Sequence, residues 1–146
     1  MKLPRWIAAG LGLTTGPRQA ANPDRRFQVT NRTRQTVLAS NIEVAGNSAT
    51  RGRGLLGRKG LPAGSGLWIV PCESVHTFGM QFAIDLIYLD RKRRIRKLRS
   101  NVRPWRISAC LSAHSILELP AGTIRSTRTT PNDVLEFSET AAPASS

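Results

Sequence analysis

The sequence has few acidic residues, few cysteines and no long apolar run, and each shortage limits what kind of protein it can be. Only 9 Asp and Glu stand against 22 Lys and Arg, so the formal net charge is +13. This excess makes polyanions, such as nucleic acid, phosphorylated ligands and membrane head groups, the natural non-specific partners. The two cysteines are too few for a small disulfide scaffold. No apolar run approaches the ~20 residues of a membrane-spanning helix, so we expect no membrane span.

The length of 146 residues suits one compact domain with short tails. We assign the domain to residues 25–137, a poorly ordered leader to 1–24 and a disordered tail to 138–146. The leader starts basic and turns apolar, but no convincing small-x-small cleavage motif follows. We therefore expect a cytoplasmic protein in which Cys72 and Cys110 are reduced thiols. The alternative is export through a degenerate N-terminal signal.

Short β-rich runs separated by turns dominate the rest of the chain. Hydrophobic patterning predicts strands at 27–30, 36–39, 42–45, 67–70, 84–89, 94–99, 115–119 and 133–137. An N-cap signal at 46–48 predicts a short helix over 49–58. These elements indicate a mainly β, α+β domain with a strongly curved or barrel-like sheet and one or two short helices.

Three segments carry a resemblance to a known family. They are RGRGLLGRKGL at 51–61, GLWIVPCESVHTFGMQFAIDLIYLD at 66–90 and SILELPAG at 115–122, followed by a late acid, Asp133. In their order and spacing they resemble domain-of-unknown-function family 192. The resemblance implies a compact domain dominated by strands, and it implies no established reaction. The family commonly has a glycine in the hairpin turn that this chain builds from residues 90–93, so we expect a turn that avoids positive φ or is longer than usual.

Two carboxylates stand out because of their neighbours. Asp85 and Glu118 each lie between aliphatic residues in a predicted strand, where a buried carboxylate must find hydrogen bonds, a cation or a proton. The first hypothesis places them with His76 in a polar pocket, as candidate general acids or bases of a small-ligand binding or catalytic module. Whether the protein is an enzyme stays open. The candidate ligand-binding residues around this pocket are Arg51, Arg58, Thr77 and Met80, with an arginine as anion anchor. The alternatives are an internal ion pair with Arg51 or Arg58, or a strand face turned to water.

A basic segment carries the second hypothesis, a nucleic-acid or polyanion accessory. Nine Lys or Arg residues lie between 91 and 106, with Trp105 among them, which is a composition typical of single-strand binders. The candidate contacts are Arg93, Arg94, Arg96, Lys97 and Trp105. No base-reading motif accompanies them, so we expect largely non-specific affinity. The alternative is a solvated hairpin edge that resists aggregation, with Trp105 anchoring the loop to the core.

A third hypothesis concerns a soft metal. Cys72, His76 and Met80 follow one another at spacings of four, and a helical turn would place this copper(I)- or zinc-type ligand set on one face. Each of the three is more commonly a core residue, so we assign no metal and no cofactor. No phosphate-binding loop, dinucleotide fingerprint or paired CxxC is present, and the small-molecule partner is unknown.

Overall fold

The structure is a computed structural model that describes residues 24–141. Residues 1–23 of the expected leader and residues 142–146 of the expected tail lie outside the described residues.

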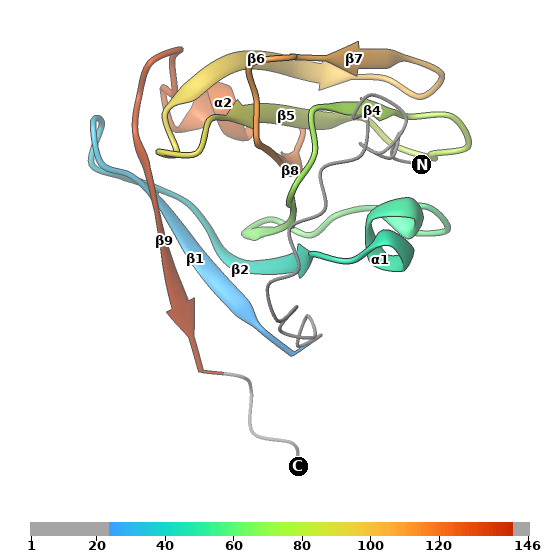
Figure 1. Cartoon of the computed structure of the whole chain (residues 1–146), viewed down its shortest axis with the longest axis horizontal. Coiled ribbons are helices and arrows are strands. Elements are labelled where there is room, and N and C mark those ends of the chain that lie inside the picture. The colour runs from blue at the N-terminus through green and yellow to red at the C-terminus, as the bar shows by residue number, and fades with distance from the viewer. Residues whose placement is uncertain (1–23, 142–146) are drawn as a thin grey trace, which may run out of the picture.

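The described chain is mainly β, as predicted, with one large mixed sheet and two short helices (Figure 1). The large sheet has the strand order β6-β5-β8-β3-β2-β1-β9, and all its neighbours are antiparallel except β2 and β3. Its strands are β1 (Arg26–Asn31), β2 (Thr36–Ala45), β3 (Ser65–Ile69), β5 (Ile84–Leu89), β6 (Ile95–Val102), β8 (Ser115–Pro120) and β9 (Leu135–Thr140). A separate two-stranded sheet consists of β4 (Ser74–His76) and β7 (Ile107–Ala109), and the helices are α1 (Ser48–Arg53) and α2 (Thr123–Ser126).

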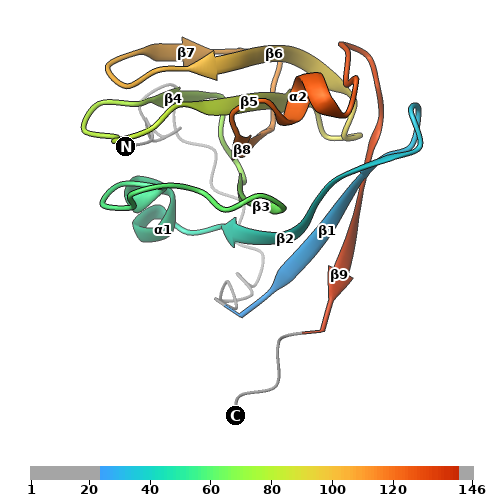
Figure 2. The same ribbon diagram turned by 180° about the vertical axis from the view of Figure 1, so that it is seen from behind.

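The large sheet is strongly curved without closing into a barrel. Its two edge strands approach each other at one end, where Arg94 and Val134 form an isolated antiparallel bridge. The Ile95 N–H donates to the Asp133 carbonyl at 2.9 Å, and the Leu135 N–H donates to the Arg93 carbonyl at 3.0 Å. Figure 2 shows β9 beside β1 at the right, with the chain that leads into it rising to the level of β6.

Strand β5 is buried along its whole length because it separates two core clusters. Ile87 and Leu89 face the cluster that contains Ile124 of α2. Leu86 and Tyr88 face the other cluster, which lies beneath β4 and β7. Successive side chains of a strand point to opposite faces, so a strand between two cores needs a nearly continuous apolar run, as this one has.

Gly66 permits the closest packing in the centre of the sheet. A Cβ atom at this position would lie 2.6 Å from both the Glu118 carbonyl oxygen and the Ile42 Cδ1. The backbone carbonyl cannot move aside without breaking the β3–β8 ladder, so this position requires glycine.

Several element boundaries differ from the predictions for physical reasons. The runs predicted at 36–39 and 42–45 form one strand, β2. Its pairing with β1 shifts register at residues 40–41, where the N–H groups of Ser40 and Asn41 both donate to the Gly64 carbonyl. The first helix has the predicted cap at Asn47 but ends at Arg53, since Gly54 takes a φ of 49°. Strands β4 and β7 and helix α2 were not predicted. Strand β9 continues to Thr140, beyond the expected domain end at residue 137.

Of the two alternatives expected for the 90–93 turn, the one without a positive φ is wrong. Arg93 takes a positive φ of 62°, in the position where other hairpins of this kind place glycine. The Asp90 carboxylate holds the turn by accepting the N–H groups of Lys92 and Arg94 at 2.9 and 3.0 Å. The Arg93 guanidinium lies over the stacked rings of two core aromatics, 5.2 Å from the Trp68 ring centroid and 4.8 Å from that of Phe137. These contacts offset the strain of a left-handed arginine.

Within residues 24–141, no helix has the length and apolar character that crossing a bilayer requires.

Candidate functional site

Asp85 connects three segments of backbone. It is fully buried, and its two oxygens accept the N–H groups of Asn101 in β6 at 2.9 Å and Ile124 in α2 at 2.8 Å. Asn101 has a φ of 52° and lies where the β5–β6 pairing shifts register. Its N–H therefore bonds to the Asp85 carboxylate and not to the backbone of β5. The arrangement suits a structural carboxylate whose partners are peptide groups.

Neither arginine proposed as the partner of Asp85 takes that role. The Arg51 guanidinium donates to the Gly46 carbonyl at 3.1 Å, within its own loop. Arg58 forms an ion pair with Glu43 at 2.8 Å. The ion-pair alternative therefore fails for Asp85, because backbone amides occupy both of its oxygens.

The three candidate catalytic residues do not all meet. Alternation along β5 and β8 directs Asp85 toward the cluster of Ile87 and Leu89, and Glu118 toward the opposite cluster, where Leu86 and Ile116 lie. His76, in β4, lies on the same side as Glu118. A site that uses both carboxylates with His76 would need to cross the sheet. A catalytic role for His76 or Glu118 stays a prediction.

The candidate metal ligands lie on a strand and a turn, so their spacing of four does not align them on a helix face. All three are buried. The Cys72 thiol donates to the Ser74 carbonyl at 3.2 Å, and the His76 Nδ1 accepts the Phe78 N–H at 3.4 Å. Within the described part of the chain, no group of three His, Cys, Asp or Glu side chains is placed to hold a metal ion.

Thr77 holds the loop after β4 against the loop before β7. Its hydroxyl donates to the Arg103 carbonyl at 2.7 Å and accepts the Arg106 N–H at 2.9 Å. Its backbone carbonyl accepts the Trp105 N–H at 3.1 Å. These bonds fix Trp105 in a left-handed conformation with a φ of 65°. Thr77 is therefore a positioning residue for Trp105.

Three rings form a stack that leads from the interior to the surface. The buried His76 ring lies 4.7 Å from Phe78, and Phe78 lies 5.7 Å from Trp105 with 28° between the ring planes. Trp105, at the outer end, is 67% exposed. A large aromatic side chain held outward by a fixed loop offers its free ring surface to a ligand.

An exposed apolar line continues from Trp105 along β7. Trp105, Ile107 and Leu111 lie at spacings of two and four residues, and their side chains are 67%, 60% and 83% exposed. Ser108, between them, points inward and accepts the Tyr88 hydroxyl at 2.7 Å. We call Phe78, Trp105, Ile107 and Leu111 the β7 strip. Apolar residues at every second position from 105 to 111, beside the basic segment, were the sequence signal that could have revealed it.

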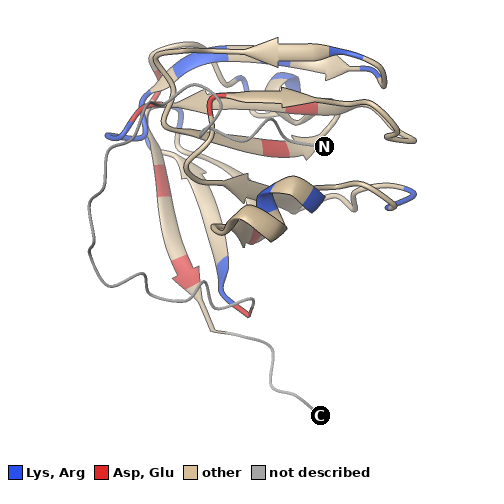
Figure 3. Cartoon of the chain, turned by 45° about the vertical axis from the view of Figure 1, so that its right-hand side comes forward, with Lys and Arg blue, Asp and Glu red and all other residues tan. Residues whose placement is uncertain are grey.

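The β7 strip lies beside the basic β5–β6 hairpin, and Figure 3 shows Lys and Arg along this layer. Three of the predicted nucleic-acid contacts are engaged within the protein: Arg93 on the core rings, Arg94 on the Asn132 carbonyl at 3.1 Å and Lys97 on the Ala109 carbonyl at 2.7 Å. Arg96 is exposed. The further exposed cations of this layer are Arg91, Lys92, Arg103 and Arg106.

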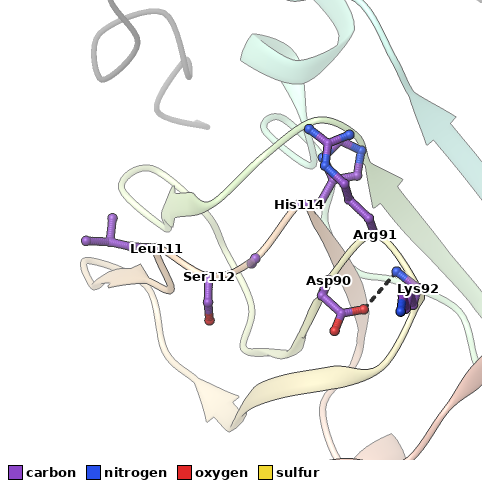
Figure 4. Close-up of a pocket in the computed structure, with 7 residues that line it drawn as sticks. Asp90, Arg91, Lys92, Leu111, Ser112 and His114 are labelled. Carbon is purple, nitrogen blue, oxygen red and sulfur yellow. Dashed lines mark hydrogen bonds between the residues drawn. The ribbon is translucent and has the colours of Figure 1, made fainter.

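A shallow pocket of about 390 Å³ lies at the far end of the strip (Figure 4). Arg91 and Lys92 project from the hairpin turn on one side, and Leu111 and Ser112 from the β7–β8 loop on the other. His114 completes the wall. The pocket joins cationic groups to the exposed Leu111, so the strip has an aromatic end at Trp105 and a cationic end here.

Tyr88 is buried beneath β7 and donates its hydroxyl hydrogen to Ser108 of that strand. Burial raises the pKa of its phenol from 10.0 to about 12, against the lowering effect of the hydrogen bond to Ser108. The phenol therefore stays neutral and keeps donating to Ser108 across the neutral pH range.

Asp133, the late acid of the family pattern, is a second buried structural carboxylate. Burial alone would raise its pKa, but hydrogen bonds from Asn31, Thr130 and Arg34 outweigh burial and hold the pKa below 3.8. The Asn31 amide donates at 2.9 Å and the Arg34 Nε at 3.2 Å. The network joins β1 to the loop before β9.

Comparison with known proteins gives a family and two fold neighbours. Residues 29–137 match the family DUF192, described as "Uncharacterized ACR". A crystal structure of a candidate transcription regulator from Sinorhizobium meliloti 1021 superposes with a TM-score of 0.69, at 21% identity over 77% of this chain and 92% of that one. A protein of unknown function from Novosphingobium aromaticivorans DSM 12444 superposes with a TM-score of 0.68, at 19% identity over 93% of this chain and 99% of that one. No curated protein matches significantly in sequence. At these identities the neighbours establish the fold alone.

Proposed function

The chain belongs to the uncharacterised family DUF192, and we propose that it binds single-stranded nucleic acid along the β7 strip. The observation that carries this proposal is Trp105, which is 67% exposed, stacked on Phe78 and fixed by the Thr77 hydrogen bonds. Every base has a flat face, so an exposed ring beside cations binds single strands with little sequence preference.

The charge distribution supports a polyanionic ligand. The net charge is +13, and Arg103 and Arg106 flank the ring, while Arg91 and Lys92 lie at the other end of the strip. Only Ile107–Ala109 of this segment is extended, between the bend at Trp105 and the turn at Leu111. Phosphates at the cationic end and a base on Trp105 would use both features.

The described helices offer no element for reading the major groove of a duplex. Readers of the major groove insert a helix or a β-ribbon with side chains that reach base edges. The two helices within residues 24–141 have six and four residues and present no such face. The candidate transcription regulator from S. meliloti has the same fold, and contact with nucleic acid would suit the role in its description. We propose the cytoplasm as the compartment, since nucleic acid is accessible there and Cys72 and Cys110 stay reduced.

The test is fluorescence anisotropy with a labelled oligo(dT) of about 12 nucleotides, a length within the site sizes of single-strand binders. Trp105→Ala should weaken binding about 5- to 150-fold, since stacking contributes about 1–3 kcal/mol per base. Val37→Ala, at an exposed apolar residue away from the strip, is the matched control and should leave affinity unchanged. The logarithm of affinity should fall with that of salt by about 0.7 for each phosphate engaged.

Two outcomes would refute the proposal. One is equal affinity for Trp105→Ala and wild type at each salt concentration, which would reduce the interaction to diffuse charge. The other is tighter binding of duplex than of oligo(dT).

A further inference from the structure

A second pocket lies beside α1, on a different part of the molecule from the β7 strip. It has a volume of about 390 Å³, within the range of small-molecule sites. Strand β2, the helix and the loop that follows it form its walls. Ala45 and Leu67, both buried in the core, form an apolar floor.

The rim of this α1 pocket carries excess positive charge. Arg53, Arg58 and Glu43 all line it. Glu43 is already neutralised, because Arg58 lies 2.8 Å from one of its oxygens and Arg26 lies 3.9 Å from the other. The Arg53 side chain is exposed, and its guanidinium forms no hydrogen bond or ion pair with any residue from 24 to 141. The pocket therefore offers one uncommitted guanidinium above an apolar floor.

The remaining polar groups of the rim are fixed in place. The Asn47 Oδ1 accepts both the N–H and the hydroxyl of Thr50, at 2.8 and 3.0 Å. This arrangement leaves the Asn47 amide nitrogen as a donor for a ligand. Arg51 does not take part, because its guanidinium donates to the Gly46 carbonyl. Of the two arginines that the sequence suggested as an anion anchor, only Arg58 lines the pocket.

We infer that the α1 pocket binds a small molecule that carries one carboxylate or phosphate group on a compact apolar body. Arg53 holds the anionic group, with the Asn47 amide as a further donor. The apolar body lies on Ala45 and Leu67. Glu43 competes with the ligand for Arg58, so the resident carboxylate sets the affinity of the site. This inference is independent of nucleic-acid binding at the β7 strip.

The test is a two-dimensional amide NMR titration with four probes: phenyl phosphate, benzoate, inorganic phosphate and phenol. Phenyl phosphate or benzoate should shift the amides of Ala45, Gly54 and Leu67 saturably. Its Kd should be at least about ten times lower than that of inorganic phosphate or phenol, because only it uses both guanidinium and floor. The better of the two aryl anions identifies the ligand as a phosphate or a carboxylate.

Three variants make the test specific. Arg53→Gln should raise the Kd at least about tenfold, and Glu43→Gln should lower it, since Arg58 is then released to the ligand. Arg125→Gln removes the same charge from the exposed surface of α2 and should change the Kd less than twofold. The inference is overturned if the shifts spread over the basic surface without saturating, or if Arg53→Gln and Arg125→Gln have equal effects. The spectrum of each variant also reports its folding, and the opposite sign expected for Glu43→Gln cannot arise from a general loss of structure.

Discussion

Replacing Asp85 with alanine should destabilise the fold more than replacing any exposed carboxylate. The side chain is fully buried, and its oxygens accept the N–H groups of Asn101 and Ile124 at 2.9 and 2.8 Å. Alanine leaves both amides without an acceptor: the Ile124 N–H is then buried and unsatisfied, whereas the N–H of the exposed Asn101 can bond to water. The buried bond to the charged group contributes about 1.5–3 kcal/mol and the part-buried bond to Asn101 about 0.5–1.5 kcal/mol, so the free energy of unfolding should fall by about 2–4.5 kcal/mol. A domain of this size has a total of about 5–15 kcal/mol, so the variant should be close to unfolding.

Urea denaturation followed by circular dichroism measures this loss. Asp85→Asn keeps one acceptor oxygen and should lose about half as much as alanine. Glu136→Ala is the matched control, since Glu136 is about half exposed and lies 3.4 Å from the exposed Arg32. Surface pairs of this kind contribute about 0–1 kcal/mol, and the control should stay within that range.

Amide hydrogen exchange adds a local measurement. One of the two N–H groups, of Asn101 or Ile124, should exchange faster in Asp85→Asn than in Glu136→Ala, because the asparagine side chain keeps only one acceptor oxygen. Equal urea midpoints for Asp85→Ala and Glu136→Ala would refute the reasoning. Asp85 would then be dispensable to the fold, and its place in a ligand site would again be the better explanation of its burial.

Three further predictions follow from groups with known environments. The lowered pKa of Asp133 stabilises the fold above the unfolded pKa of about 3.9, and this stabilisation is lost as the pH falls through the lower folded pKa. In Asp133→Asn the free energy of unfolding should therefore depend less on pH in the acid range. An unchanged pH dependence would contradict this prediction. Tyr88 is the single tyrosine, so an absorbance titration of the folded protein should show a midpoint at about pH 12. Its contribution to stability is present below pH 10 and is lost as the pH rises through 12. A midpoint at pH 10 in the folded protein would contradict its burial. Thiol titration of denatured, non-reduced protein should find two groups, because Cys72 and Cys110 are both free, whereas none would indicate a bridge and an oxidising compartment.

The sequence alone determined the fold class, the family and most of the large sheet. Strands such as β5 and β8 were predictable because burial on both faces demands a continuous aliphatic run, which is a local signal. The cap at Asn47 was equally local, since its partner Thr50 lies three residues away. The net positive charge and the place of Trp105 within the basic segment 91–106 could also be read from the sequence.

Only the tertiary structure decided what each candidate residue contacts. The Asp85 carboxylate accepts hydrogen bonds from backbone amides that lie 16 and 39 residues away in the sequence, and no local pattern encodes such contacts. Strands β4 and β7 have three residues each, too few for a periodic signal, and they exist because they pair with each other over the core. Arg93 was predicted to be a surface cation, but the curved sheet brings Trp68 and Phe137 beneath it and its guanidinium contacts their rings. This contact also offsets the strain of its left-handed backbone. Contacts between distant segments follow from the path of the whole chain, so the chemistry of a residue was predictable where its partners are close in sequence and undetermined where they are not.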